Sequence, residues 1–355
     1  MNNIVKVDKN FAVSTKIEKD DIKFYDVLSE PFKIYGVFRE GGKWRRMPEA
    51  VAKTVSEGVY SLHANTAGGR VRFKTDSPYI AINTKLSGLG RMSHFTLCGA
   101  AGFDLYLNGA HQGSFRPPFD MVDGYEALRD GYSSIDGYGT SEMRDVEINF
   151  PLYTDVLELY IGVSENSKIL PPDPYKIERP VVYYGSSITQ GGCASRPGAC
   201  YQAILSRELS VDHINLGFSG NAKGEPEIAN YIKSLDMSVF VYDYDFNAPD
   251  LAHLEATHEK MFRVIREANP TLPILIMSKP KPVLDATNIK RFECIKRTYE
   301  NAKASGDENV YFIDGRELMA FAGKEGTVDT THPTDFGFFS MATRISPVLK
   351  EILYK

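Results

Sequence analysis

A serine, a histidine and an aspartate stand where they could carry out acyl transfer. Ser187 follows the apolar run 181–184 and begins a predicted helix, so its side chain would project from the edge of a sheet. His332 can accept a proton near neutral pH, and Asp329, three residues earlier, can hold the imidazole in the required tautomer. Acyl transfer needs a nucleophile, a base and a group that orients the base. We therefore predict these roles for the three residues.

Groups that could stabilise an oxyanion follow two further predicted strands. The backbone N–H groups of Ser187 and Gly220 and the side-chain amide of Asn247 can donate, and each such donor lowers a reaction barrier by ~3–4 kcal/mol. Glycine at position 220 also lets the backbone approach a substrate closely, because it has no Cβ. Structural roles are the alternative, since serine and asparagine commonly cap helices and glycine commonly serves a turn.

The second half of the chain contains the elements that must position these groups. Short apolar runs alternate with helical spacing, which indicates a parallel sheet covered by helices on both faces. In such sheets, ligands bind beyond the carboxyl ends of the strands. The four segments that contain Ser187, Gly220, Asn247 and the pair Asp329 and His332 each follow a strand, so they can meet at one edge. Strands are predicted at 181–184, 213–216, 238–242, 273–277 and 310–313, and helices at 199–209, 254–268, 288–304 and 336–353.

The first half has a different pattern, in which apolar and polar residues alternate with period two. Many short strands of this kind, separated by glycine and proline turns, favour an antiparallel sandwich. The proline-rich stretch around residues 171–180 is predicted as a linker, because proline fixes φ and lacks an N–H donor. The strands are predicted at 71–75, 79–83, 103–107, 146–150 and 157–163. We expect a sandwich domain at 1–163, a linker at 164–180 and an α/β domain at 181–355.

The composition excludes several classes of protein. The chain has 355 residues, of which 43% are hydrophobic and 25% charged, with a formal net charge of −5. That length favours two domains, and the mild acidity argues against a nucleic-acid partner. No apolar run approaches the roughly 20 residues that span a bilayer, and the first nine residues do not resemble a secretory signal. We therefore expect a cytoplasmic protein with no membrane partner.

The cysteines and histidines give no metal-binding pattern. The four cysteines form no CxxC pair and are expected to be reduced thiols, with a bond between Cys193 and Cys200 as the alternative. His258 lies on the predicted polar side of helix 254–268 and is not part of an HExxH motif. His94 lies beside a strand pattern and is expected to be structural. We predict neither a metal nor a cofactor.

Four segments of the chain, taken together, resemble the sequence blocks of the SGNH (GDSL) hydrolase superfamily. They occur in the order of that family and are Gly185-Ser-Ser-Ile-Thr-Gln-Gly191, Gly220, Asn247 and Asp329-Thr-Thr-His332. The resemblance implies that Ser187 is the nucleophile. It implies that Gly220 and Asn247 complete the oxyanion hole, and that Asp329 and His332 complete a triad. It also implies a three-layer, flavodoxin-like domain with a five-stranded parallel sheet.

Two positions depart from the usual pattern of this family. Ser186 stands where an aspartate usually precedes the nucleophile, and the third block, Asp243-Tyr-Asp-Phe-Asn247, lacks the usual Gly-x-Asn-Asp. Asn247 is therefore assigned from its position after strand 238–242. Arg196 follows the nucleophile segment and is a candidate substrate contact, with surface solvation as the alternative.

The first half resembles a companion domain named for a Gly-x-Asp-Leu-Tyr motif, which is Gly102-Phe-Asp-Leu-Tyr106 here. This resemblance implies a jelly-roll-like sandwich, in which Asp104 and Tyr106 belong to the sandwich or to the domain interface. Three roles stay open for the sandwich: a sugar-binding module, a wall of the active site, or the interface of a homo-oligomer. Members of this two-domain group look like esterases and are often assigned to acetylated sugars.

The leading hypothesis is a metal-free serine esterase acting on small acyl esters, most simply acetyl esters of carbohydrates. The partner would be a small-molecule ester rather than a macromolecule. One alternative is a lipid or thioester acylhydrolase, which should need a long apolar groove. The other is a carbohydrate-binding protein whose hydrolase half is inactive.

Overall fold

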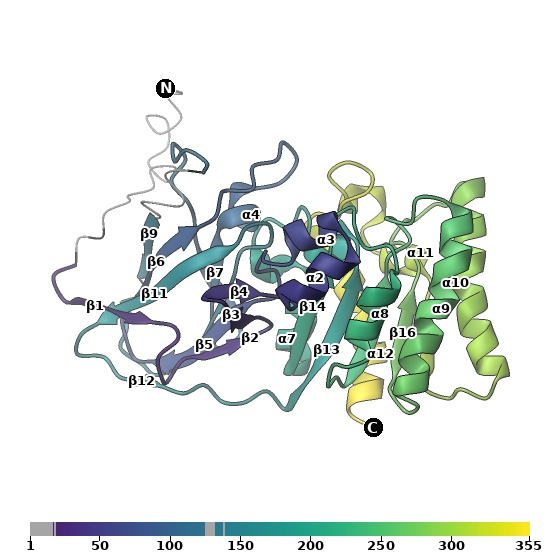
Figure 1. Ribbon diagram of the computed structural model, residues 1–355. Helices are drawn as coiled ribbons and strands as arrows, with labels where there is room; N and C mark the ends of the chain where they lie inside the picture. Colours follow the sequence, from purple (N-terminus) through teal and green to yellow (C-terminus); the bar gives the residue numbers. More distant parts are fainter. Residues whose placement is uncertain (1–16, 18, 125–131, 138) are drawn as a thin grey trace.

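The first half of the chain folds into two antiparallel sheets, as its period-two pattern predicts (Figure 1). The structure is a computed structural model and describes residues 17, 19–124, 132–137 and 139–355. The first nine residues, for which no secretory signal is predicted, lie outside this range. One sheet has the order β1-β11-β6-β9, with strands at Ile22–Asp26, Val156–Ser164, Tyr79–Leu86 and Tyr132–Gly137.

The other sheet of this half has the order β12-β5-β10-β7-β8, with β2 also pairing with β5. The strands are β12 (Ile169–Leu170), β5 (Arg70–Thr75), β10 (Arg144–Asn149), β7 (Phe103–Leu107), β8 (Ala110–Phe115) and β2 (Lys33–Tyr35). One apolar core joins both sheets: Ile82 and Ile161 of the first sheet and Phe73, Phe103 and Ile148 of the second are all buried in it. The fold is therefore the predicted antiparallel sandwich. A short hairpin of β3 (Phe38–Glu40) and β4 (Lys43–Arg45) and the helix α4 (Leu97–Ala101) also belong to this half.

The second half is a parallel sheet of five strands in the order β14-β13-β15-β16-β17, which is the predicted flavodoxin-like arrangement. The strands are β13 (Ile177–Gly185), β14 (Val211–Gly217), β15 (Val239–Asp243), β16 (Ile274–Met277) and β17 (Val310–Ile313). The α-helices are α6 (Ser187–Gln190), α7 (Tyr201–Leu209), α8 (Pro226–Ile232), α9 (Leu251–Ala268), α10 (Ala286–Ala304), α11 (Gly315–Leu318) and α12 (Asp335–Leu353). Two short 3-10 helices are η2 (Pro197–Ala199) and η3 (Gly323–Gly326). Among the described residues, no helix is long and apolar enough to cross a membrane.

The strands of this sheet are buried on both faces, which explains their nearly continuous apolar sequence. In β13, Val181 and Tyr183 face a core formed with α7 and α12. Val182 and Tyr184 of the same strand face a second core formed with α8, α9 and α10. Helices therefore cover both sides and leave the carboxyl ends of the strands for the loops that carry the polar segments.

A short helical segment of the first half packs on the second half. The helices α2 (Glu49–Val55) and α3 (Glu57–Leu62) lie over α8 in Figure 1, and Met47, Ala52 and Val59 are buried in the same core as β13 and α8. Arg46, which is also buried, donates to the carbonyl oxygens of Gly217 at 2.6 Å and Leu62 at 2.7 Å. The two halves thus share part of one core.

The stretch 164–180, predicted as a linker without regular structure, contains strand residues at both ends. Ile169–Leu170 pairs with β5 of the sandwich, and β13 already begins at Ile177. β13 runs through Pro180, which has no N–H to contribute to the sheet. This is possible because the pairing of β13 with β14 shifts register between Ile177 and Val181. The expectation that this stretch cannot continue a strand is therefore wrong at 177–180, where a proline fits such an irregularity. The assignment of 164–180 as a linker stays a prediction.

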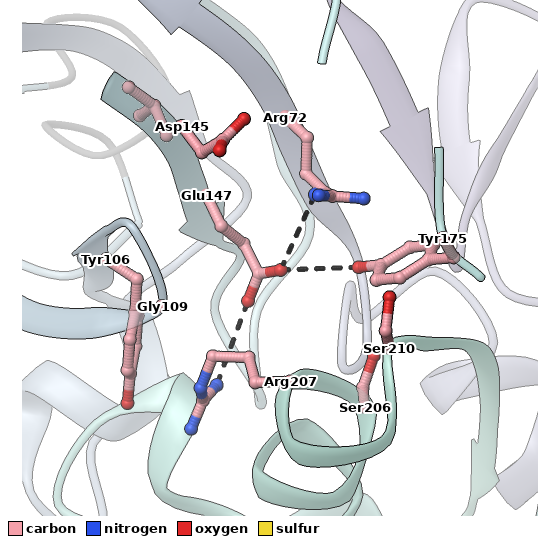
Figure 2. A pocket seen from close by; sticks show the side chains of 10 residues that line it. Arg72, Tyr106, Gly109, Asp145, Glu147, Tyr175, Ser206, Arg207 and Ser210 are labelled. Atoms are coloured by element: carbon pink, nitrogen blue, oxygen red, sulfur yellow. Dashed lines mark hydrogen bonds and ion pairs between the residues drawn. The ribbon is translucent and has the colours of Figure 1, made fainter. Parts of the chain in front are cut away.

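A small polar pocket lies where the two halves meet (Figure 2). Glu147 of β10 lies at its centre: Tyr175 Oη donates to Oε2 at 3.2 Å, and Arg207 of α7 approaches Oε1 at 3.7 Å. Arg72 of β5 approaches the same carboxylate from the other side, at 3.9 Å. The pocket has a volume of about 110 Å³, and an ion-pair network that joins the sandwich to α7 lines it.

Candidate active site

The turn between β13 and α6 sets the position of Ser187. The hydroxyl of the buried Ser186 accepts a hydrogen bond from Ile188 N at 3.2 Å and so caps α6. Ser187 is the first residue of this helix, and its Oγ lies 2.9 Å from Nε2 of His332. Helix α6 ends at Gly191, whose φ of 104° lies in the left-handed region that favours glycine. Of the two serines, Ser186 is thus the cap and Ser187 contacts the histidine.

Asp329 and His332 lie on one tight loop before α12. Asp329 Oδ2 lies 2.7 Å from His332 Nδ1, and Oδ1 accepts from the backbone N–H groups of His332 at 2.7 Å and Thr331 at 3.0 Å. The loop is closed by the bridge between Thr327 and Pro333. Because a carboxylate can only accept, Nδ1 must carry the proton and Nε2 faces Ser187 with its lone pair.

The environment of Asp329 keeps its carboxyl group ionised. Partial burial works against the charge, but the N–H groups of His332 and Thr331 and the imidazole ring outweigh it and lower the pKa of Asp329 below its ordinary value. The side chain is 38% exposed, and that of His332 is 21% exposed, so the pair is open to solvent. The carboxylate is therefore available throughout the neutral pH range.

Gly220 lies in the loop after β14, which is tied to the loop of Ser187. Phe218 N donates to Gly185 O at 2.8 Å, and Ser219 N donates to Oε1 of Gln190 at 3.0 Å. Gly220 has a φ of 71°, and a Cβ there would meet no heavy atom within 4 Å in the part of the chain that the structure describes. The backbone conformation, rather than crowding, therefore favours glycine at this position.

Asn247 lies in the loop after β15 and is joined to the loop of Gly220. Its Oδ1 accepts from Ala222 N at 3.3 Å, and its backbone N–H donates to Tyr244 O at 2.9 Å. The amide oxygen is thus oriented toward the protein, and the NH₂ group is the part that can donate to a substrate. Asp250, not Asn247, caps α9, because its side chain accepts from His253 N. The capping alternative for Asn247 is therefore wrong.

An acidic pair lies buried at the start of the Asn247 loop. Asp243 and Asp245 are almost fully buried, and burial raises the pKa of both carboxyl groups, most strongly that of Asp243. The nearby Lys279 is also buried and opposes this shift. Asp243 is the register partner of Gly185 in β13, so the pair lies close to the nucleophile turn. Nothing in the sequence had indicated a role for either residue.

The sandwich also contributes side chains to the site. Tyr153 Oη donates to the carbonyl oxygen of Ser187 at 3.2 Å. His94, from the segment between β6 and α4, has its ring centroid 5.3 Å from that of His332. Gln190 joins the two halves, because its NH₂ group donates to Asn65 Oδ1 at 3.2 Å. The expectation that His94 is merely structural missed this proximity, which depends on how the two halves pack.

The Gly-x-Asp-Leu-Tyr motif joins the sandwich to the turn after the nucleophile. The buried carboxylate of Asp104 accepts from Gly198 N at 2.7 Å, and Tyr106 Oη donates to Gly198 O at 3.1 Å. Arg196 approaches Asp104 at 3.8 Å and Asp335 at 3.9 Å, and its side chain is only 22% exposed. The motif therefore belongs to the domain interface, and Arg196 takes part in that interface rather than lying free at the surface.

We expect Asp104 to make the stability of this interface depend on pH. Burial raises the pKa of Asp104 to about 6 from 3.8, although Arg207 and the hydrogen bonds oppose it. A carboxyl group that binds its proton more tightly when folded contributes less to the free energy of unfolding as pH rises through 3.8 to about 6. Relative to Asp104→Asn, the free energy of unfolding of wild type should fall by about 2–3 kcal/mol as pH rises across this window.

Urea denaturation at several pH values checks this expectation, with Asp120→Asn, which changes an exposed aspartate of the same half, as the matched control. The control should follow the wild-type curve at every pH, because no comparable burial acts on that side chain. Parallel curves for wild type and Asp104→Asn would show that Asp104 does not bind a proton more tightly in the folded state.

The fold and the site together define a class of protein. A three-layer α/β domain with a bonded serine, histidine and aspartate at the carboxyl edge of its sheet has the architecture of serine-type hydrolases. Residues 178–350 match the model of the GDSL-like lipase/acylhydrolase family. Residues 22–169 match the model of the N-terminal domain of SGNH hydrolase-type esterases. The chain therefore belongs to the SGNH (GDSL) hydrolases that carry this N-terminal domain.

Solved structures with the same architecture align along nearly the whole chain. A protein of Bacteroides ovatus assigned as a GDSL-like lipase is 28% identical, with a TM-score of 0.81 over 94% of this chain and 98% of that chain. The salicylyl-acyltransferase SsfX3 of a tetracycline biosynthetic pathway is 19% identical, with a TM-score of 0.77 over 95% and 99%. A family two carbohydrate esterase from Clostridium thermocellum is 14% identical, with a TM-score of 0.61 over 91% and 99%. The last two similarities concern the fold alone. No curated protein matches the chain.

Proposed function

We propose that this protein is a serine esterase in which Ser187 is the nucleophile, His332 the base and Asp329 the group that orients the base. One observation carries the proposal: Ser187 Oγ lies 2.9 Å from His332 Nε2, and His332 Nδ1 lies 2.7 Å from Asp329 Oδ2. Both distances are those of hydrogen bonds, and they join the three groups in the order that nucleophilic catalysis requires. Membership of a hydrolase family supports the same conclusion.

In the first half of the reaction, Ser187 Oγ attacks the carbonyl carbon of the ester. His332 Nε2 takes the hydroxyl proton, and the resulting imidazolium is stabilised by Asp329. The negative charge on the tetrahedral oxygen is accepted by the N–H groups of Ser187 and Gly220 and by the NH₂ group of Asn247. The imidazolium then protonates the leaving alcohol, and the acyl group stays bonded to Ser187.

In the second half, water takes the place of the alcohol. His332 removes a proton from the water, which attacks the acyl carbon and forms a second tetrahedral intermediate at the same donors. The intermediate collapses, the proton returns from His332 to Ser187 Oγ, and the free acid leaves. Each step uses the same base, so no further ionisable group is required.

We propose that the substrate is a small acyl ester, most simply an acetyl ester of a carbohydrate. His94 and Tyr153 of the sandwich stand beside the triad, and a second domain at the rim favours a compact acyl group over a long chain. Similar architectures occur in a family two carbohydrate esterase and in an acetyl xylan esterase from Butyrivibrio proteoclasticus, with a TM-score of 0.57 for the latter. These similarities support the substrate class without naming the sugar.

Comparing 4-nitrophenyl acetate with 4-nitrophenyl octanoate tests the preference for a short acyl chain. We expect kcat/KM to be higher for the acetate by about 10-fold or more. A site too small for the octanoyl chain gains no binding energy from that chain. Faster turnover of the octanoate would instead favour the lipid acylhydrolase.

Acetylated xylo-, manno- and amino-sugar oligosaccharides then test the alcohol part of the substrate. Release of acetate from one of these series identifies the sugar. A protein that binds the oligosaccharides but hydrolyses neither them nor the nitrophenyl esters would be the inactive carbohydrate-binding protein.

A further inference from the structure

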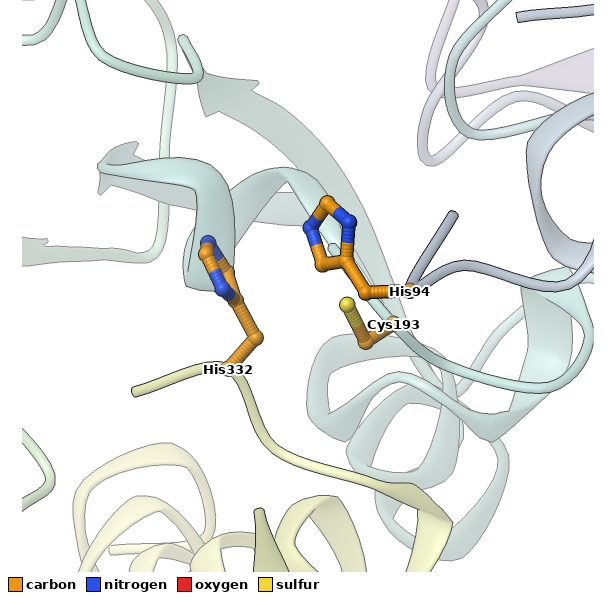
Figure 3. Close-up of side chains that lie close together, drawn as sticks. All are labelled: His94, Cys193 and His332. Carbon is orange, nitrogen blue, oxygen red and sulfur yellow. The ribbon is translucent and has the colours of Figure 1, made fainter. Parts of the chain in front are cut away.

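Three side chains with metal-binding atoms lie together at the edge of the site: His94, Cys193 and His332 (Figure 3). One ligand atom from each residue lies within 4.8 Å of the other two. They come from three separate loops, namely the one before α4, the one after α6 and the one before α12. Only His332 has a place in the proposed reaction, so the reaction does not explain why the other two are there.

The backbone holds Cys193 in this position. Its φ is 75°, in the left-handed region that few non-glycine residues adopt, and the residue is buried. Just before it, Gly192 N donates to Ser187 O at 2.8 Å, which ties the loop to the nucleophile turn. The thiol of Cys193 is free and is not part of a disulfide. This turn therefore places the thiol beside the triad.

The hydrogen bond to Asp329 prepares His332 to be a metal ligand. Because Asp329 Oδ2 lies at Nδ1, the lone pair of the ring is on Nε2, the atom that faces Ser187. A carboxylate on the far nitrogen is the usual arrangement behind a zinc-bound histidine, where it fixes the tautomer and raises the basicity of the ligand. The lone pair that makes Nε2 a base therefore also makes it a ligand.

We infer that His94, Cys193 and His332 form a Zn²⁺ site that switches off the proposed esterase. Two imidazoles and one thiolate suit Zn²⁺, with a water molecule as the fourth ligand. Zn–N bonds of about 2.1 Å and a Zn–S bond of about 2.3 Å require ligand atoms about 3.4–3.6 Å apart. His94 is exposed and can move inward to reach this spacing, while Cys193 is held by its turn.

Binding of the ion removes the base from the reaction. The Cys193 thiol loses its proton to water, and His332 Nε2 donates its lone pair to Zn²⁺ instead of accepting the proton of Ser187. The inhibition rests on the proposed function, whereas the binding of the ion does not. Chelation of the ion restores the lone pair and with it the activity.

Calorimetric titration of the metal-free full-length protein with Zn²⁺ tests the site directly. Wild type should bind one ion, and Co²⁺ in its place should give the absorption of a thiolate-bound tetrahedral ion. Cys193→Ser and His94→Ala should each weaken binding by more than ~10-fold, because each removes a ligand. Cys98→Ser and His111→Gln, which change a cysteine and a histidine outside the cluster, should bind the ion as wild type does.

Ester hydrolysis measured in the same samples separates the two proposals. Zn²⁺ should inhibit wild type in proportion to its occupancy, and the chelator EDTA should reverse this. Failure of wild type to bind one ion, or equal binding by Cys193→Ser and His94→Ala, overturns the site. Binding that follows the expected variant pattern in a protein with no esterase activity leaves the site standing and overturns the proposed function instead.

Discussion

We expect Ser187→Ala to abolish ester hydrolysis while leaving the fold intact. The hydroxyl is the only group removed, and its oxygen, Ser187 Oγ, lies 2.9 Å from His332 Nε2. Loss of the nucleophile in a serine hydrolase lowers kcat by on the order of 10⁶-fold, because the remaining groups no longer act as a unit. Steady-state hydrolysis of 4-nitrophenyl acetate measures the loss, and an unchanged circular dichroism spectrum shows that the fold is kept.

Ser186→Ala is the matched control, because it removes a hydroxyl from the adjacent residue. Ser186 caps α6 through its bond from Ile188 N, so its loss should lower the free energy of unfolding by about 1 kcal/mol. Most of the activity should remain. The reverse pattern, with Ser186→Ala inactive and Ser187→Ala active, would show that Ser186 is the nucleophile and that the assignment to Ser187 is wrong.

The sequence predicted the main elements of the α/β half because its signals are local. The apolar runs 181–184 and 310–313 fall within β13 and β17, and the helical spacing of 254–268 falls within α9. Parallel strands end at one edge of a sheet, so the segments that follow them can meet there. This convergence can be predicted although the segments are far apart in the sequence. Ser187, Asp329 and His332 do come within bonding distance at that edge.

The position of His258 shows how a local pattern can be misread. We predicted His258 on the polar side of its helix. It lies four residues after Leu254 and three before Met261, however, and both of these line the buried face. His258 is buried, stacks on Tyr242 with ring centroids 4.8 Å apart, and pairs with Thr298 Oγ1 at 2.8 Å. Burial lowers the pKa of His258 to about 3, so the ring is neutral. The error came from sorting residues by polarity instead of by face.

Contacts between the two halves were beyond the reach of the sequence. Nothing near His94 indicates that it lies beside His332, more than two hundred residues later. In the same way, Asp104 carries a recognisable motif, but its partner Gly198 belongs to the other half. Such pairs follow from how two cores pack against each other, and neither periodicity nor spacing records that packing.

We expect Asp329→Asn to lower kcat by about 10³–10⁴-fold, which is less than the loss caused by removing the base in His332→Ala. The carboxylate accepts from His332 Nδ1 at 2.7 Å and so leaves the lone pair on Nε2. An asparagine that donates its NH₂ group to Nδ1 would place the proton on Nε2, where the ring can no longer accept the proton of Ser187. KM should change little, because the substrate does not contact Asp329 in the proposed reaction.

The pH dependence of kcat in wild type and in Asp329→Asn distinguishes two roles of Asp329: orienting the His332 ring and supplying a negative charge. The pKa of Asp329 lies below its ordinary value, so in wild type the carboxylate stays ionised down to acidic pH and its protonation should not limit activity near neutrality. In Asp329→Asn, kcat should be lower than that of wild type at every pH and should not recover at high pH. The wrong tautomer of His332 persists once the ring is neutral. If the variant instead retains wild-type activity, the working site is a dyad of Ser187 and His332, and Asp329 only closes the loop through its bonds to the N–H groups of Thr331 and His332.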